Sequence, residues 1–256
     1  MTHDTSAAQL DANDIRQLIA ADAANKPRSL KTGPGPSSIG HPCPRHLAHL
    51  IANTPKISEG GDPLPAWVGT EGHAGMERIL STLPDWETEI GVTLGGYNIT
   101  GTADAYHRPS GSVVDWKFVG AGLLKGYRDN GPGPQYRTQA HLYGCGLTLA
   151  GYDVTTVAIA FIPRSGLSTG IYLWSEPYDV QIVEDAMARY DAVATITGMS
   201  GPAAVPTADA KCSWCPWYMP AATDLTEACP GHIPPPVAGT ATETQPSTTQ
   251  PERTNP

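Results

Sequence analysis

The spacing of apolar residues changes several times along the chain, and each change predicts a new structural element. A period of about 3.6 residues predicts helices over residues 11–24, 45–51, 65–83, 135–150 and 179–196. Alternating or continuous apolar runs predict strands over residues 87–94, 97–106, 112–119, 154–162 and 171–174. From residue 65 onward, the order helix, three strands, helix, strand is typical of an α/β protein with a mixed central sheet flanked by helices.

The local composition divides the chain into three parts. Residues 1–36 contain the first predicted helix and the start of a Gly-, Pro- and Ser-rich linker over residues 32–38. Residues 37–232 contain all the predicted strands, so we expect one folded domain there. Residues 233–256 are rich in Pro and Thr and contain no Leu, Met or aromatic residue. We predict a disordered tail, because such a segment has little apolar surface to bury.

The overall composition narrows the class of protein. With 40% hydrophobic residues over 256 positions, the chain can bury one sizeable core. It has no apolar run near the ~18 residues of a membrane span and no secretion signal, so we expect a soluble cytoplasmic protein without a membrane partner. A net charge of −9 argues against a protein that coats nucleic acid. Five cysteines in a reducing compartment indicate a metal, a cluster or plain burial before disulfides.

Charged residues interrupt two of the predicted strands. Asp104 lies within an otherwise small and apolar run, and Asp115 and Lys117 are two residues apart, so they share one face of the next strand. A buried carboxylate is costly unless it is paired or binds a metal. Two carboxylates can hold Mg²⁺, and a lysine can orient or deprotonate an attacking water. The simpler interpretation is an ordinary salt bridge between Asp115 and Lys117 at a strand end.

Further polar residues lie on the helices before and after these strands. His73 follows Gly69 on the upstream helix, and Gln139 and Tyr143 share one face of the downstream helix because they are four residues apart. Each of them alone is also compatible with a core or surface position.

Taken in this order, the motifs resemble the PD-(D/E)XK nuclease superfamily, and within it the RecB-like and Cas4-like exonucleases, including those of phages. The family patterns G-x-x-x-H, G-x-x-D, acidic-x-K and Q-x-x-x-Y are matched by Gly69/His73, Gly101/Asp104, Asp115/Lys117 and Gln139/Tyr143. The resemblance implies a restriction-endonuclease-like core with the order α-β-β-β-α-β. It also implies a location in the host cytoplasm if the protein is encoded by a phage.

The resemblance also implies a role for each residue of these motifs. Mg²⁺ or Mn²⁺ would be held by three side chains and one backbone carbonyl, those of His73, Asp104, Asp115 and Trp116. Lys117 would be the catalytic lysine, and Gln139 and Tyr143 would position the DNA strand or support the site. Four nearby carboxylates remain without a role at this stage: Glu71, Glu77, Glu87 and Glu89.

The cysteines form a second candidate site. Cys212 and Cys215 make a C-x-x-C pair, whose thiolates can grip one metal or cluster, and distant cysteines can complete the shell. The resembled family often holds a [4Fe–4S] cluster with one cysteine before the nuclease core and three after it, a layout matched by Cys43, Cys212, Cys215 and Cys229. A cluster bound in this way would hold the two ends of the core together.

Two features leave this second assignment open. The interval of 13 residues between Cys215 and Cys229 is longer than the usual family gap, so His232 or Cys145 could replace Cys229. Zn²⁺ is an alternative to the cluster. Cys145 lies among leucines of a predicted helix and suits core packing better.

We therefore expect a metal-dependent deoxyribonuclease, an exonuclease that acts on DNA ends or single strands in recombination, repair or replication. Proteins of those processes would be possible partners, and an oligomer is compatible with the resemblance. The alternatives are a nuclease fold that binds DNA or a partner with little cleavage, and an iron–sulfur redox protein. Because the net charge is negative, we expect DNA binding to be weak and to depend on the metal.

Overall fold

The computed structural model describes residues 11–25, 33–58 and 61–232. It contains one mixed sheet whose strands lie side by side in chain order. The strands are β1 (Trp86–Leu94), β2 (Ile99–His107), β3 (Ser112–Val119), β4 (Thr156–Pro163) and β5 (Tyr172–Pro177). Neighbouring strands are antiparallel except β3 and β4, which run parallel and are joined through helices.

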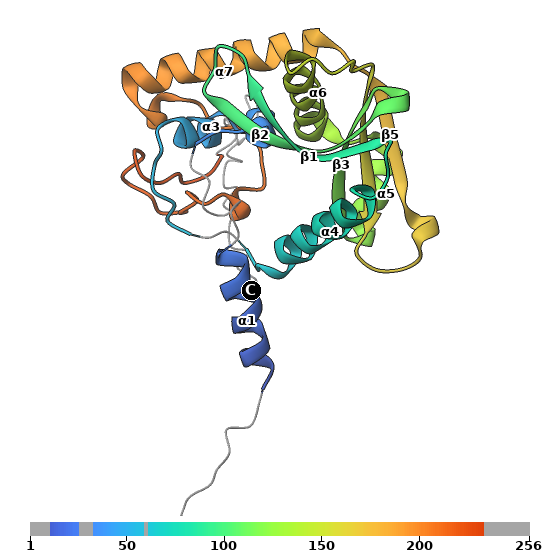
Figure 1. Ribbon diagram of the computed structural model, residues 1–256. Coiled ribbons are helices and arrows are strands. Elements are labelled where there is room, and N and C mark those ends of the chain that lie inside the picture. Colours follow the sequence, from blue (N-terminus) through green and yellow to red (C-terminus); the bar gives the residue numbers. More distant parts are fainter. Residues whose placement is uncertain (1–10, 26–32, 59–60, 233–256) are drawn as a thin grey trace, which may run out of the picture.

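Helices cover both faces of this sheet (Figure 1). The helices of the described residues are α1 (Ala12–Ala24), α2 (Pro36–Ile39), α3 (Pro44–Ile51), α4 (Leu64–Leu80), α5 (Ala121–Asn130), α6 (Gly133–Leu149) and α7 (Val180–Ser200). Helix α1 contacts α4 and projects away from the sheet. One face packs on α4 through Leu80 and Met76, and the opposite face packs on α6 through Leu142 and Leu147. Helix α7 packs on the outer side of α6 and forms a second helical layer over this face. The expected mixed α/β core with the order α-β-β-β-α-β is thus confirmed in α4-β1-β2-β3-α6-β4.

Two differences from the expected elements have local causes. The structure adds α5 between β3 and α6; this helix contains few apolar residues and buries only Leu124, so it does not stand out in the sequence. The expected linker is partly folded as α2, because Pro36 supplies a preformed first helical turn and Ile39 is fully buried in the core. The predicted tail, 233–256, lies outside the described residues.

The two ends of the core lie side by side. Arg45 on α3 donates hydrogen bonds to the carbonyl oxygens of Val205 and Ala203, at 2.7 and 3.0 Å. Leu47 and Val205 share a buried cluster. In Figure 1 the segment after α7 accordingly runs beside α3. No helix in the described parts of the chain combines the length and apolar character of a membrane span.

The sheet is distorted where β1 meets β2. Glu89 has a left-handed backbone conformation with φ of 50°, which is uncommon for a residue other than glycine. On one side of it Thr88 pairs with Ala105, which packs toward α4; on the other side Ile90 pairs with Ala103, and both pack toward α6. At the level of Glu89 and Asp104, the regular alternation of side chains in β1 and β2 is therefore interrupted. Residues two positions apart point to opposite faces of the sheet there.

Candidate active site

Asp115 and Lys117 form an ion pair in the interior of β3 rather than at its end. The Lys117 Nζ lies 2.6 Å from the Asp115 Oδ2, and the lysine side chain is 16% exposed. Gln139 on α6 donates a hydrogen bond of 2.8 Å to the other carboxylate oxygen of Asp115. Because Asp115 itself is only 2% exposed, this pair differs from the exposed salt bridges that add little to a protein.

Asp104 lies where β2 and β3 separate. Regular pairing of these strands ends at Ala105 with Val114, and one oxygen of the buried Asp104 carboxylate accepts a 2.9 Å hydrogen bond from the Trp116 backbone N–H. The other oxygen lies 3.2 Å from Nδ1 of His73 on α4. The Asp104 side chain thus accepts a hydrogen bond from a backbone N–H at the point where the regular pairing of β2 and β3 has ended.

His73 reaches the sheet because α4 approaches it closely. A Cβ on Gly72 would lie 2.4 Å from the Phe118 ring, so only glycine fits between α4 and β3 at this level. A Cβ on Gly69 would meet nothing within 4 Å. The glycine that matters for this packing is therefore Gly72, which the motif-based prediction did not single out.

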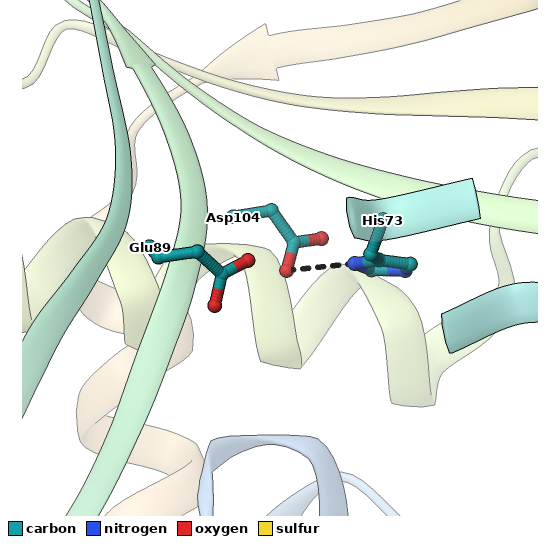
Figure 2. Close-up of side chains that lie close together, drawn as sticks. All are labelled: His73, Glu89 and Asp104. Atoms are coloured by element: carbon teal, nitrogen blue, oxygen red, sulfur yellow. Dashed lines mark ion pairs between the residues drawn. The ribbon is translucent and has the colours of Figure 1, made fainter. Parts of the chain in front are cut away.

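Glu89 completes a group of three possible metal ligands (Figure 2). One donor atom each from His73, Glu89 and Asp104 lies within 4.8 Å of the others. Glu89 reaches this place from β1 because of its left-handed conformation. By contrast, Glu87 two residues earlier is engaged by Tyr152 and by an ion pair with Arg108. The sequence contains both glutamates at strand spacing, and nothing in it distinguishes them.

The electrostatic environment differs between the two buried aspartates. Burial raises the pKa of Asp115 above its usual value; the ammonium of Lys117 opposes this shift, and the charge of Asp104 adds to it. Burial acts on Asp104 in the same direction, but the hydrogen bond and charge of His73, with smaller contributions from Lys117 and the Trp116 N–H, lower its pKa overall. Because Lys117 does not offset the effect of burial on Asp115, a cation bound nearby would stabilise the ionised form of this carboxylate.

The remaining motif residues lie around this group. Gln139 is buried, and its side-chain amide also lies 3.4 Å from the hydroxyl oxygen of Tyr143. Tyr143 packs against Gly101, where a Cβ would lie 3.2 Å from its ring. The Lys117 Nζ lies 4.8 Å from the centre of the Tyr136 ring. The structure thus brings the predicted residues of all four motifs together.

A cleft of about 490 Å³ opens over Lys117, Gln139 and Tyr143. Its opposite wall is formed by residues from the two ends of the core, among them Lys56 and Trp217. The Trp217 indole is buried, donates to the carbonyl oxygens of Thr54 and Pro55, and stacks on His49 with ring centres 5.1 Å apart.

Cysteines line a second, enclosed cavity beside this wall. The lining includes the four cysteines of the predicted cluster site, Cys43, Cys212, Cys215 and Cys229. His232 lies there too, and Nδ1 of His46 is 3.5 Å from the Cys215 sulfur. Cys145 is not among the lining residues. It lies on α6 and packs on Tyr178, as expected for a core thiol.

The buried His49 gives the fold a pH dependence. Burial, with a smaller contribution from the charge of Arg45, lowers its pKa to about 4. Between about pH 6.5 and pH 4 the unfolded chain therefore binds a proton at this position that the folded protein excludes, and stability falls as the pH is lowered. We expect His49→Gln to reduce that loss, by up to about 1.4 kcal/mol per pH unit.

The measurement is denaturant unfolding at pH 7 and pH 5. His107→Gln, at the half-exposed end of β2, is the matched control. An equal pH dependence in the wild type and His49→Gln would contradict the assignment.

No protein-family model matches the chain, and no curated protein matches its sequence. Among solved structures, an alkaline exonuclease from Laribacter hongkongensis is similar with a TM-score of 0.47 and 10% identity, covering 65% of this chain and 88% of that one. A phage-related exonuclease from Haemophilus somnus 129PT gives 0.47 and 14%, covering 66% and 96%. The protein SSO0001 gives 0.43 and 19%, covering 70% and 86%. These similarities concern the fold alone.

Proposed function

We propose that this protein is a metal-dependent nuclease that hydrolyses phosphodiester bonds of DNA. The observation that carries the proposal is the buried group of Asp104, Asp115 and Lys117, placed where two strands separate and next to a cleft. A purely structural ion pair would need neither the second buried aspartate nor the strained glutamate beside it. Strained backbone of this kind is concentrated at functional sites.

The donor atoms fit a hard divalent cation. His73, Glu89 and Asp104 supply one imidazole and two carboxylates. The predicted ligand Asp115 is not part of this group, because Lys117 and Gln139 engage its two carboxylate oxygens, but its pKa responds to the charge of Asp104 nearby. Oxygen-rich sets of this kind suit Mg²⁺ and Mn²⁺. The resemblance adds the backbone carbonyl of Trp116 as a ligand. A cation held there would supply Lewis-acid polarisation of a phosphate oxygen.

The protein residues then have separate tasks. Lys117 shares one ammonium hydrogen with Asp115, which leaves two donors for a water or a phosphoryl oxygen in the cleft. Gln139 holds the Asp115 carboxylate in one orientation through its second oxygen. Tyr143 supports Gln139 from the next turn of α6 and contributes its ring to the cleft wall.

We also propose that the cysteine cavity holds a [4Fe–4S] cluster through Cys43, Cys212, Cys215 and Cys229. A tetrahedral zinc site with Zn–S bonds of about 2.3 Å places its sulfurs about 3.8 Å apart. Within the described residues, no three Cys or His donor atoms of this cavity lie within 4.8 Å of one another. What supports the cluster is that all four cysteines of the predicted layout line one cavity, since four thiolates are the usual ligands of a [4Fe–4S] cluster. Zinc remains the alternative.

The proposed activity is tested by incubating the purified protein with end-labelled linear DNA, single-stranded and double-stranded, and with internally labelled circular DNA. We expect Mg²⁺- or Mn²⁺-dependent cleavage that EDTA abolishes, and protection of the circular substrates if the enzyme requires ends. Binding of all three substrates without cleavage under any of these conditions would instead indicate a module that holds DNA.

Divalent cations should also stabilise the folded protein. A ligand at about 100 times its Kd adds about 2.7 kcal/mol, which corresponds to a Tm increase of about 5 °C or more for a domain of this size. We expect Mg²⁺ or Mn²⁺ to raise the Tm of the wild type, to have no effect on Asp104→Asn, and to have a reduced effect on Glu89→Gln. The measurement is a thermal melt with and without the metal.

The matched control for these two variants is Glu77→Gln, because Glu77 is an exposed carboxylate on α4. It should keep the full metal-dependent increase. If Asp104→Asn also keeps that increase, the cation binds elsewhere.

A further inference from the structure

A second groove begins where the active-site cleft ends. It has a volume of about 450 Å³ and is lined by residues of α5, the start of α6 and the loop that carries Cys212 and Cys215. Three residues, His46, Gln135 and Tyr136, line both the groove and the cleft over Lys117. The two hollows are therefore adjacent, and Tyr136, whose ring lies beneath the Lys117 ammonium, stands between them.

The groove is rich in aromatic rings. Tyr127, Tyr136 and Trp214 line it, and the side chain of Trp214 is 58% exposed, which is high for a tryptophan. Trp214 belongs to the short 3₁₀ turn η4 (Cys212–Trp214), which is closed by backbone hydrogen bonds from Trp214 to Lys211 and from Cys215 to Cys212. Gly61 packs on its ring, where a Cβ would lie 3.2 Å away.

The charge of the two hollows differs from that of the chain. The sequence has 25 acidic and 16 basic residues, yet no Asp or Glu is among the described residues that line either hollow. Both contain lysine: Lys56 and Lys117 line the cleft, and Lys211 lines the groove beside Trp214. Two adjacent hollows that lack acidic lining residues and carry three ammonium groups are together complementary to a polyanion.

We propose that this groove binds the unpaired nucleotides of a single-stranded DNA segment that adjoins the bond to be cleaved. Bases stack on the Trp214 indole, with Tyr136 and Tyr127 available further along, and Lys211 contacts a backbone phosphate. Aromatic platforms combined with a cationic groove are the common basis of single-strand binding. Duplex DNA is not expected there, because its bases stack on each other and cannot reach a protein ring.

This inference rests on the proposed nuclease function, and its test compares a long with a minimal substrate. The long substrate is a single-stranded oligonucleotide, and the minimal one is thymidine 5′-(p-nitrophenyl phosphate), which is too short to reach the groove. We expect Trp214→Leu to lower kcat/KM on the oligonucleotide about 10-fold and to leave the minimal substrate unaffected. Trp214→Phe, which keeps an aromatic ring, should recover most of the loss.

Lys211→Gln should weaken oligonucleotide binding and reduce the slope of log affinity against log salt by about 0.7, as expected for one lost phosphate contact. The matched control is Lys125→Gln on the exposed surface of α5, which should change neither quantity. Binding is measured by fluorescence anisotropy in EDTA, so that this arm does not depend on cleavage. Iron content and the melting curve show whether each variant keeps its cysteine site.

The possible results separate the two proposals. A wild type that cleaves neither substrate overturns the nuclease function; a loss of oligonucleotide binding in Trp214→Leu and Lys211→Gln would still support the groove. Cleavage by the wild type with unchanged oligonucleotide kinetics in both variants overturns the groove alone. An equal loss on both substrates also overturns it, because the effect then arises at the reacting centre.

Discussion

Replacing Asp115 with asparagine, or Lys117 with methionine, is expected to lower the rate of DNA cleavage at least about 10³-fold while leaving the fold intact. The expectation follows from position: both side chains are held at the point where the strands separate, and the lysine faces the cleft. Fixed charges in such water-poor sites contribute far more than the same charges in water. Asparagine keeps the size of Asp115 and can still accept the Gln139 hydrogen bond.

The measurement is the single-turnover rate on labelled DNA with Mg²⁺ or Mn²⁺, together with a thermal melt of each variant. The chain offers a matched control in Lys125 and Asp129, an exposed ion pair on α5 with the same chemistry. Lys125→Met and Asp129→Asn should retain the wild-type rate. Cleavage near the wild-type rate in both Asp115→Asn and Lys117→Met would exclude the proposed site.

The second large effect is expected at the cysteines. Replacing Cys43 or Cys212 with serine should remove the bound iron, abolish absorption near 400 nm and lower the Tm by about 10 °C or more. The physical reason is loop closure: the two residues are 169 positions apart (212 − 43), and a crosslink over a loop of this size removes several kcal/mol of chain entropy from the unfolded state. The proposed cluster would also hold in place the wall of the cleft that Trp217 lines, because Trp217 lies between Cys215 and Cys229 in the chain.

Cys145→Ser is the matched control, since Cys145 lies on α6, packs on Tyr178 and does not line the cysteine cavity. It should keep both the iron and most of the stability. Metal analysis of the wild type distinguishes the two candidate groups: iron with acid-labile sulfide supports the cluster, whereas a colourless protein with one zinc supports the mononuclear site. If Cys43→Ser keeps the metal content and the Tm of the wild type, then Cys43 holds neither a cluster nor a zinc ion.

The distribution of charge refines the interpretation of the acidic composition. A net charge of −9 predicts weak DNA binding if it is spread evenly over the surface. The cleft and the groove instead lack acidic lining residues among those described, and the buried carboxylates lie behind the cleft. DNA lying in these hollows would therefore meet lysine and aromatic side chains rather than carboxylates.

Much of the site was determined by the sequence. The two-residue period of a strand places Asp115 and Lys117 on one face, and the helical period places Gln139 and Tyr143 together. The order of elements also follows from local periodicity, which is why the predicted core and the observed core agree. These features depend only on residues close together in the chain.

The remaining features depend on contacts between distant residues, and only the tertiary structure decided them. Glu89 joins the site and Glu87 does not, because β1 and β2 exchange faces at one level, an event that a regular strand period cannot express. Gly72 matters more than Gly69 because Phe118, 46 positions later in the chain (118 − 72), occupies the space beside it. The sequence specified the motif residues such as Asp115 and Lys117, whereas the packing of distant segments brought Glu89 to Asp104 and shaped the cleft over Lys117.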